Sequence, residues 1–201
     1  MQKYVFRKHS GEYKKFYEKE RRKLKKLLGF SVKIEHVGST AIEGLGGKPL
    51  VDILIGVSNL EKSRKKLEEA GYRFGENGST KERLVFGFDY PYKNRKRRVH
   101  LHVTKSGSKD WKEIIAFRDY LMQHPEAVRK YEKIKKEGVK KARGDGEAYR
   151  NYKKKFIKNI VRRALRERHK RFVRNAVQDD FVILAVSLCN IFLSPKSLSF
   201  P

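Results

Sequence analysis

The stretch Leu50–Val57 constrains the fold of this chain more than any other part of its sequence. Six of its eight residues are large and apolar, and Pro49 and Ser58 bound it. A run of that length and composition is typical of a central strand covered on both faces. Its one ionisable residue, Asp52, would then be carried into the interior of the protein.

The segments on either side of this strand predict a mixture of helices and strands. Helices are expected at 12–28 and 60–70, each ending at a glycine, Gly29 or Gly71. Further strands are expected at 32–37, 72–74, 84–88 and 98–103, and 38–48 reads as a Gly-rich loop with room for one helical turn.

The pattern becomes purely helical after Trp111. Helices are predicted at 111–122, 125–142 and from 147 to about 169, with breaks at His124-Pro125 and Gly144-Asp145-Gly146. The expected fold is therefore α/β of the α+β kind, a mixed sheet flanked by helices with a helical C-terminal half.

The domain organisation follows from the same change of pattern. One domain is expected over 1–168, with a tail over 169–201 that is either a docking segment or a peculiarity of this C-terminus. The apolar run 181–193 has 13 residues, and a membrane span needs about 20. It is interpreted as a packed or interfacial segment.

The net charge and the cysteine content of the chain limit the classes of binding partner and the cellular compartment that are expected. Of 201 residues 50 are Lys or Arg and 23 are Asp or Glu, which gives a formal net charge of +27. This excess favours a polyanionic partner such as RNA or the phosphates of a nucleotide, although heat adaptation also raises the number of charges. The single cysteine, Cys189, allows no internal disulfide, and the N-terminus lacks a signal peptide. A cytoplasmic protein without a transmembrane span is expected.

The turn that precedes the central strand has the residues of a phosphate site. Gly38 and Ser39 would let backbone N–H groups and a hydroxyl approach phosphate oxygens closely. Asp52, on the next strand, would hold Mg²⁺ against those phosphates. On spacing alone, an ordinary tight turn with a buried, hydrogen-bonded aspartate is an equal alternative.

The ordered motifs of the chain resemble the GrpB family, a branch of the nucleotidyltransferase superfamily. They run over roughly 30–165 and comprise Gly38-Ser39-Thr40-Ala41, Gly44-Leu45, Lys48-Pro49-Leu50-Val51-Asp52-Ile53-Leu54, His100-Leu101-His102-Val103, Phe117-Arg118-Asp119-Tyr120-Leu121, His124-Pro125-Glu126 and Tyr149 with Lys153 and Phe156-Ile157. The resemblance implies a nucleotidyltransferase-like fold. It does not identify a substrate. The enzymatic hypothesis for this arrangement is transfer of a nucleotidyl group from a nucleoside triphosphate to an unknown acceptor, with Mg²⁺ or Mn²⁺ and with Ser39 and Asp52 as catalytic residues.

One departure from the superfamily bears directly on chemistry. Two-metal phosphoryl transfer needs two carboxylates on one face of a strand, but the same-face neighbour of Asp52 is Leu54. His100 and His102, at period two on a later strand, could complete a site with Asp52 that suits Zn²⁺ or Mn²⁺. The alternative is that the histidines serve packing or face a phosphate.

The substrate-binding residues expected besides Gly38 and Ser39 are Thr40, Lys48, Arg83 and Lys153. Lys48 enters the Asp52 strand next to two glycines, whereas Arg83 and Lys153 are further candidates for an anion pocket.

Two side chains of the first C-terminal helix, Arg118 and Asp119, are expected to fasten the helical half to the sheet by ion pairs, and Trp111 and Tyr120 to pack as core anchors. The later helices carry basic faces in which Tyr131, Tyr149 and Tyr152 are interleaved, a pattern that would let these rings stack on bases.

Two functions remain open at this point. The first is a metal-dependent nucleotidyltransferase, and the second is a catalytically degenerate module that binds a nucleotide or RNA. A membrane-surface protein ranks last, because it rests only on the basic charge and the apolar tail.

Overall fold

The computed structural model describes the backbone of residues 6–92 and 95–192, with most of their side chains up to residue 175. Its elements are α1 (Glu12–Leu28), β1 (Lys33–Val37), a 3₁₀ turn (Ser39–Ala41), β2 (Leu50–Val57), α2 (Leu60–Glu69), β3 (Arg73–Phe74), a 3₁₀ turn (Glu76–Gly78), β4 (Arg83–Tyr92), β5 (Arg95–Lys105), α3 (Lys109–Gln123), α4 (Pro125–Ala142) and α5 (Gly146–Phe192). None of the helices in this part of the chain is long and apolar enough to cross a membrane.

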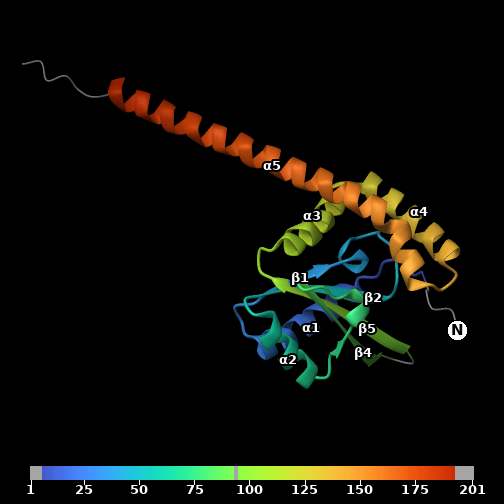
Figure 1. Ribbon diagram of the computed structural model, residues 1–201. Helices are drawn as coiled ribbons and strands as arrows, with labels where there is room; N and C mark the ends of the chain where they lie inside the picture. The colour runs from blue at the N-terminus through green and yellow to red at the C-terminus, as the bar shows by residue number, and fades with distance from the viewer. Residues whose placement is uncertain (1–5, 93–94, 193–201) are drawn as a thin grey trace, which may run out of the picture.

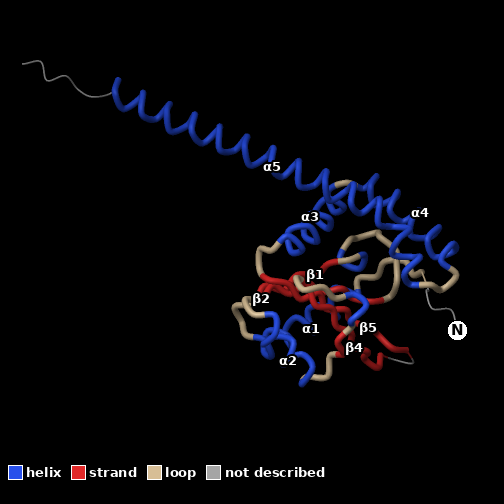
Figure 2. The backbone as a smooth tube through the Cα atoms, in the orientation of Figure 1, coloured by secondary structure: helices blue, strands red, loops and turns tan. Residues whose placement is uncertain are grey.

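The five strands form one mixed sheet in the order β1-β2-β5-β4-β3 (Figure 2). Strands β2 and β5 are parallel, and every other neighbouring pair is antiparallel. The register places Asp52 beside Val37 on one side and beside His100 on the other. The middle of β2 therefore touches both the strand that precedes the Gly-rich loop and the strand that carries the two histidines.

Helices cover the two faces of the sheet differently. Helices α1 and α2 lie on one face, and α3, α4 and α5 lie on the other (Figure 1). Alternate residues of β2 and β5, such as Ile53 and Leu101, join Leu24 of α1 and Leu67 of α2 in the larger hydrophobic core. The other alternate residues of the same strands include Asp52, His100 and His102, so the sheet turns a polar face toward the helical half.

The helical half has a hydrophobic cluster of its own, and the Gly-rich loop takes part in it. Ile42 and Leu45 of the loop are buried together with Tyr120 of α3, Tyr131 of α4 and Ile160 of α5. Because these apolar side chains are withdrawn from water, the loop is held between the sheet and the three helices.

An ion pair joins the helical half to the edge of the sheet. Arg118 of α3 lies 2.8 Å from a carboxylate oxygen of Glu35 and donates to the carbonyl of His36 at 3.0 Å, and it also pairs with Asp119. This confirms the fastening role predicted for Arg118. Tyr120 is buried as expected, whereas Trp111 is partly exposed and packs against Gly56 of β2.

The predicted elements agree with the structure except at the C-terminal end. The bounds of α1, β2 and α4 are those expected, and β4 and β5 extend beyond their predicted ends. The prediction that the last helix ends near His169 is wrong, because α5 continues to Phe192. No Gly or Pro lies between 147 and 192, so the change from basic to apolar composition at 170 did not break the helix.

The predicted boundary at 168 falls inside this unbroken helix. The docking or interfacial role expected of 170–201 concerns side chains beyond 175, which lie outside the described residues.

Substitution in the larger core will measure how much that core contributes to stability. Leu101 is fully buried at the centre of the sheet, and Leu101→Ala is expected to lower the free energy of unfolding by about 2–5 kcal/mol. Met122 is about half exposed, so Met122→Ala should change the free energy of unfolding by no more than about 0.5 kcal/mol. Urea denaturation followed by circular dichroism measures both. Equal losses would contradict the assignment of the core to the α1–α2 face of the sheet.

Candidate functional site

The centre of the polar sheet face holds one carboxylate and two imidazoles. His102 Nε2 lies 3.3 Å from Asp52 Oδ1, and His100 Nδ1 lies 3.8 Å from the same oxygen. All three side chains keep partial contact with solvent, at 21% exposure for Asp52, 25% for His102 and 35% for His100. The parallel pairing of β2 and β5 is what places these groups side by side.

Gly38 sits directly against the Asp52 carboxylate. Its φ is +71°, and a Cβ built on it would lie 2.2 Å from Asp52 Oδ2. Only glycine fits a position that combines a left-handed backbone with so close an approach. The Gly-Ser turn and the strand aspartate are therefore in contact, as the spacing predicted.

The remainder of the turn is held by hydrogen bonds from neighbouring histidines. Thr40 is buried; its hydroxyl lies 3.1 Å from His36 Nε2 and its carbonyl lies 3.3 Å from His9 Nε2. His36 stacks on Tyr17, and burial lowers its pKa to about 4, so that it stays neutral at pH 7. Thr40 thus serves to fix the turn, and Ser39 is left as the more accessible hydroxyl of the pair.

Two lysines meet beside this group, Lys48 from the loop that leads into β2 and Lys153 from α5. Lys48 Nζ lies 4.8 Å from the ring centroid of Tyr149, and Lys153 Nζ lies 4.3 Å from the same centroid. Tyr149 is buried at the start of α5, so it acts as a common platform for two like charges. Cation–π attraction offsets part of their repulsion.

A third lysine, Lys135 of α4, is brought close to the loop and was not singled out from the sequence. It is buried, donates to the carbonyl of Gly46, and its Nζ would lie 2.7 Å from a Cβ built on Gly47. The sequence spacing nevertheless indicates that Lys135 is buried. The buried stripe of α4 recurs at intervals of three and four residues and consists of Ala127, Tyr131, Lys135, Gly138 and Ala142.

The pKa values of these lysines report a site with excess positive charge. Burial, with the charge of Lys153 next in size, lowers the pKa of Lys48 to about 8. Burial and Lys153 likewise lower the pKa of Lys135 to about 7. Burial also lowers the pKa of Lys153, against the attraction of Asp52. Arg150 adds to the repulsion on Lys48 and Lys153, so an anion would be stabilised here.

Asp52 remains ionised in this environment. Burial acts to raise the pKa of its carboxyl, but the hydrogen bond and charge of His102, with the charges of His100 and Lys153, outweigh burial and lower it. Asp52 is thus a fixed negative charge that orients the surrounding cations. We refer to Asp52, Lys48, Lys153, His100 and His102 as the Asp52 group.

Two of the predicted features are placed elsewhere. Arg83 is not part of this group: it pairs with Thr104, four residues along β5 from His100, and its guanidinium lies 3.3 Å from Asp110 at the start of α3. The expectation that Tyr131 and Tyr149 stack on bases is wrong, since both rings are buried in the protein. Tyr152 donates to Glu137 at 2.9 Å.

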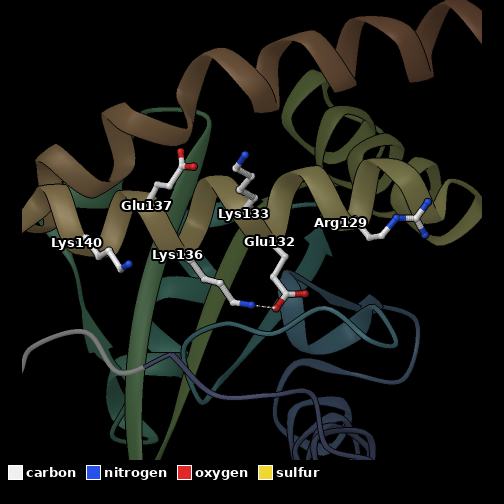
Figure 3. Close-up of a pocket in the computed structure, with 6 residues that line it drawn as sticks. All are labelled: Arg129, Glu132, Lys133, Lys136, Glu137 and Lys140. Atoms are coloured by element: carbon white, nitrogen blue, oxygen red, sulfur yellow. Dashed lines mark ion pairs between the residues drawn. The ribbon is translucent and has the colours of Figure 1, made fainter.

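A hollow of about 320 Å³ on the outer side of α4 does not coincide with the Asp52 group. Figure 3 shows that its lining consists of Arg129, Glu132, Lys133, Lys136, Glu137 and Lys140. All six come from one helix, and Lys136 already pairs with Glu132 at 2.7 Å. Such a mixed, self-paired surface has no convergent set of groups for a ligand.

The structure also bears on the predicted metal ligands Asp52, His100 and His102. Over the described residues, no group of three or more His, Cys, Asp or Glu side chains is arranged so that it could hold a metal ion. Here both imidazoles face the carboxylate itself. These residues alone do not make a complete metal site, and metal binding stays a prediction that needs ligand atoms from a bound phosphate.

A five-stranded mixed sheet with helices on both faces and a Gly-Ser turn set against a strand aspartate defines this molecule as an α+β protein. Residues 4–163 match the family model described as GrpB protein, and the chain belongs to the GrpB family. It is 36% identical over 158 residues to the glutamate-rich protein GrpB of Alkalihalophilus pseudofirmus, a match that covers 76% of this chain and 91% of that protein.

Solved structures give the same assignment. The crystal structure of conserved protein GrpB from Enterococcus faecalis superposes with a TM-score of 0.69 at 25% identity, covering 81% of this chain and 98% of that one. The Cid1 poly(U) polymerase with bound MgGTP matches 64% of this chain and 45% of its own, at 13% identity and a TM-score of 0.37. A likeness that weak carries no argument about substrate.

Two glycine substitutions will separate the contact with Asp52 from backbone strain. Gly38 and Gly44 have nearly equal φ, +71° and +74°, but a Cβ on Gly44 would meet nothing within 4 Å. Gly44→Ala should lower the free energy of unfolding by about 1–2 kcal/mol from strain alone. Gly38→Ala should lower it by about 2–5 kcal/mol, because displacement of Asp52 is added. Urea denaturation compares them, and equal losses would refute the close packing of Gly38 on Asp52.

Proposed function

We propose that the Asp52 group binds the phosphates of a nucleoside triphosphate and that this is a nucleotidyltransferase-like nucleotide-binding protein. The observation that carries the proposal is that Lys48 and Lys153 both lie over the ring of the buried Tyr149, within the electrostatic reach of the Asp52 carboxylate. Burial lowers the pKa of each lysine, and repulsion lowers it further, from Lys153 and Arg150 at Lys48 and from Arg150 at Lys153. A polyphosphate would relieve that repulsion and restore the protonated lysines.

Each side chain has a separate role in this binding. Lys48 and Lys153 neutralise phosphate oxygens, and Ser39 supplies a hydroxyl beside the close approach of Gly38. His102 and His100 flank Asp52 and limit where its charge can act. A divalent ion such as Mg²⁺ or Mn²⁺, if it enters with the nucleotide, would add charge neutralisation at Asp52.

Transfer of the nucleotidyl group is the further step proposed for this site, with Ser39 and Asp52 nearest to the reacting phosphate and the acceptor still unidentified. Binding without transfer is the second candidate, and Leu54 favours it. Leu54 occupies the position of a second carboxylate and is fully buried. A carboxylate there would lack water and would be strongly disfavoured in its charged form.

Titration calorimetry with ATP, GTP, CTP and UTP tests the proposal. Lys48→Gln and Lys153→Gln are each expected to weaken triphosphate binding by about tenfold or more, the cost of one charge-assisted contact. Lys133→Gln and Lys140→Gln remove the same charge from the exposed face of α4 and should leave binding within about twofold. Equal weakening in all four variants would refute a specific site at Asp52.

The role of the metal separates the two candidates. Repeating the titration with and without Mg²⁺ or Mn²⁺ should show metal-dependent binding that Asp52→Asn abolishes, if the protein works as a transferase. Weak, metal-independent binding that Asp52→Asn leaves unchanged would instead indicate a binding module.

The pKa of Lys48 predicts the pH dependence of binding. Phosphates bind the protonated lysine, and the pKa of Lys48 in the free protein is about 8. Affinity for a triphosphate should therefore fall as the pH rises from 7.5 to 9, and binding should take up protons at pH 8.5. The same titrations with Lys48→Gln should show a flatter pH profile. A wild-type affinity that rises over this range would contradict the assignment.

A further inference from the structure

The exposed surface of α5 carries a regular row of positive charge that begins beside the Asp52 group and continues well beyond it. Because four residues turn an α-helix by about 400°, the row winds about 240° around α5 between residues 150 and 174. Every fourth residue from Arg150 to Arg174 is Lys or Arg, and all of these positions are exposed. Between 150 and 174 the helix has twelve Lys and Arg residues and one acidic residue, Glu167. We call the exposed residues at this four-residue spacing the α5 row.

The row is continuous with the Asp52 group at one end. Its first member, Arg150, directly follows Tyr149, over whose ring Lys48 and Lys153 lie. The charge of Arg150 also lowers the pKa values of both lysines. The later members lead away from the sheet along α5, which projects beyond the rest of the molecule (Figure 1). At 1.5 Å per residue, the row extends over about 36 Å, with about 6 Å between successive charges along the axis.

Such a row opposes the stability of the helix that carries it. Like charges four residues apart repel one another. Ile160 and Ala164 pack in the helical cluster, but every described side chain from 166 to 175 is exposed, so the outer part of the helix gains little from tertiary packing to compensate. A polyanion laid along the row would remove this repulsion and release its own counterions. The arrangement is thus adapted to an extended polyanion rather than to a single small anion.

The side chains of the row favour a nucleic-acid backbone over a membrane surface. A helix that lies on a membrane needs an apolar face. The six consecutive residues 166–171 are Arg, Glu, Arg, His, Lys and Arg, which surround the full circumference of the helix with polar groups. Tyr131 and Tyr149, the rings nearest in sequence pattern to a stacking platform, are buried. In the described part of α5 the exposed aromatic ring is that of Phe172, at 73% exposure, and stacking on such a ring tolerates any base. The row therefore offers many contacts to phosphates and no hydrogen-bond pattern that would select a base sequence.

We infer that the α5 row binds the phosphodiester backbone of a nucleic acid without regard to base sequence, and that it guides the end of a strand toward the Asp52 group. The first part stands on the row alone. The second part, that the row guides the end of a strand to the Asp52 group, rests on the proposed function. It identifies a nucleic-acid strand as the acceptor or as the bound partner of that site.

Fluorescence anisotropy with a labelled 30-nucleotide single-stranded RNA of mixed sequence tests the inference. The row variant carries Lys158→Gln, Arg162→Gln, Arg166→Gln and Lys170→Gln, and leaves Arg150 and the Asp52 group intact. The matched control carries Lys62→Gln, Lys65→Gln, Lys81→Gln and Lys105→Gln, which removes the same charge from exposed positions outside α5.

The row variant should bind the RNA at least about tenfold more weakly at 50 mM salt, and the slope of log affinity against log salt should become shallower by about 3, from about 0.7 per lost contact. The control should keep both properties. A variant with Lys158→Arg, Arg162→Lys, Arg166→Lys and Lys170→Arg keeps the charge and should bind as the wild type does, which shows that the loss is one of charge and not of folding.

Several outcomes would overturn the inference. Equal weakening in the row variant and the control would mean that net charge alone attracts RNA. Binding to vesicles of anionic phospholipid, with none to the RNA, would assign the row to a membrane surface instead. Calorimetry of the row variant with ATP keeps the two proposals apart, because triphosphate binding should be unchanged there even when RNA binding is lost.

Discussion

The insertion of Ile42 and Leu45 between the sheet and the helical half is the interaction on which the site depends. These two residues belong to the loop that joins β1 to β2, yet they are buried among side chains of α3, α4 and α5. The loop is also held by its short 3₁₀ turn, by the backbone pairing of Gly47 with Arg7 and by hydrogen bonds to Thr40 and Gly46, which are all polar contacts. Burial of two large apolar side chains adds a hydrophobic anchor directly after the turn.

The same arrangement explains why the polar face of the sheet remains partly accessible. The helical half rests on the loop and on the Arg118–Glu35 ion pair at the sheet edge, and so does not need to bury Asp52, His100 and His102. Lys48 and Lys153 meet these groups across the seam. The lysines oppose folding: because the pKa of Lys48 is below its unfolded value, the unfolded chain binds more protons between about pH 8 and 10, and stability rises with pH there. A bound anion would reverse this cost.

The sequence predicted the fold and the centre of the site because both follow from local patterns. The apolar run Leu50–Val57 and the period-two histidines placed Asp52, His100 and His102 side by side, which the register of β2 and β5 confirms. The stripe of α4 predicts that Lys135 is buried, but its contact with the carbonyl of Gly46 depends on how α4 packs against the loop, which local pattern does not encode. The separation of Arg83 from the group depends on the register of β4 against β5, which alternation does not encode. The length of α5 was missed because a change in composition was taken for the end of a helix.

Leu54 is buried at the position where a second metal-binding carboxylate would stand. It is fully buried two residues beyond Asp52, on the face of β2 that α3 approaches, close to the Arg118–Glu35 pair that secures the seam. A carboxylate at 54 could bind a second metal only if water or a cation reached that position, and this would open the seam between sheet and helices. The packing that holds the helical half in place is therefore incompatible with a two-carboxylate metal site on this strand. In the proposed function, positive charge from lysines, rather than a pair of metal ions, would therefore neutralise the phosphates.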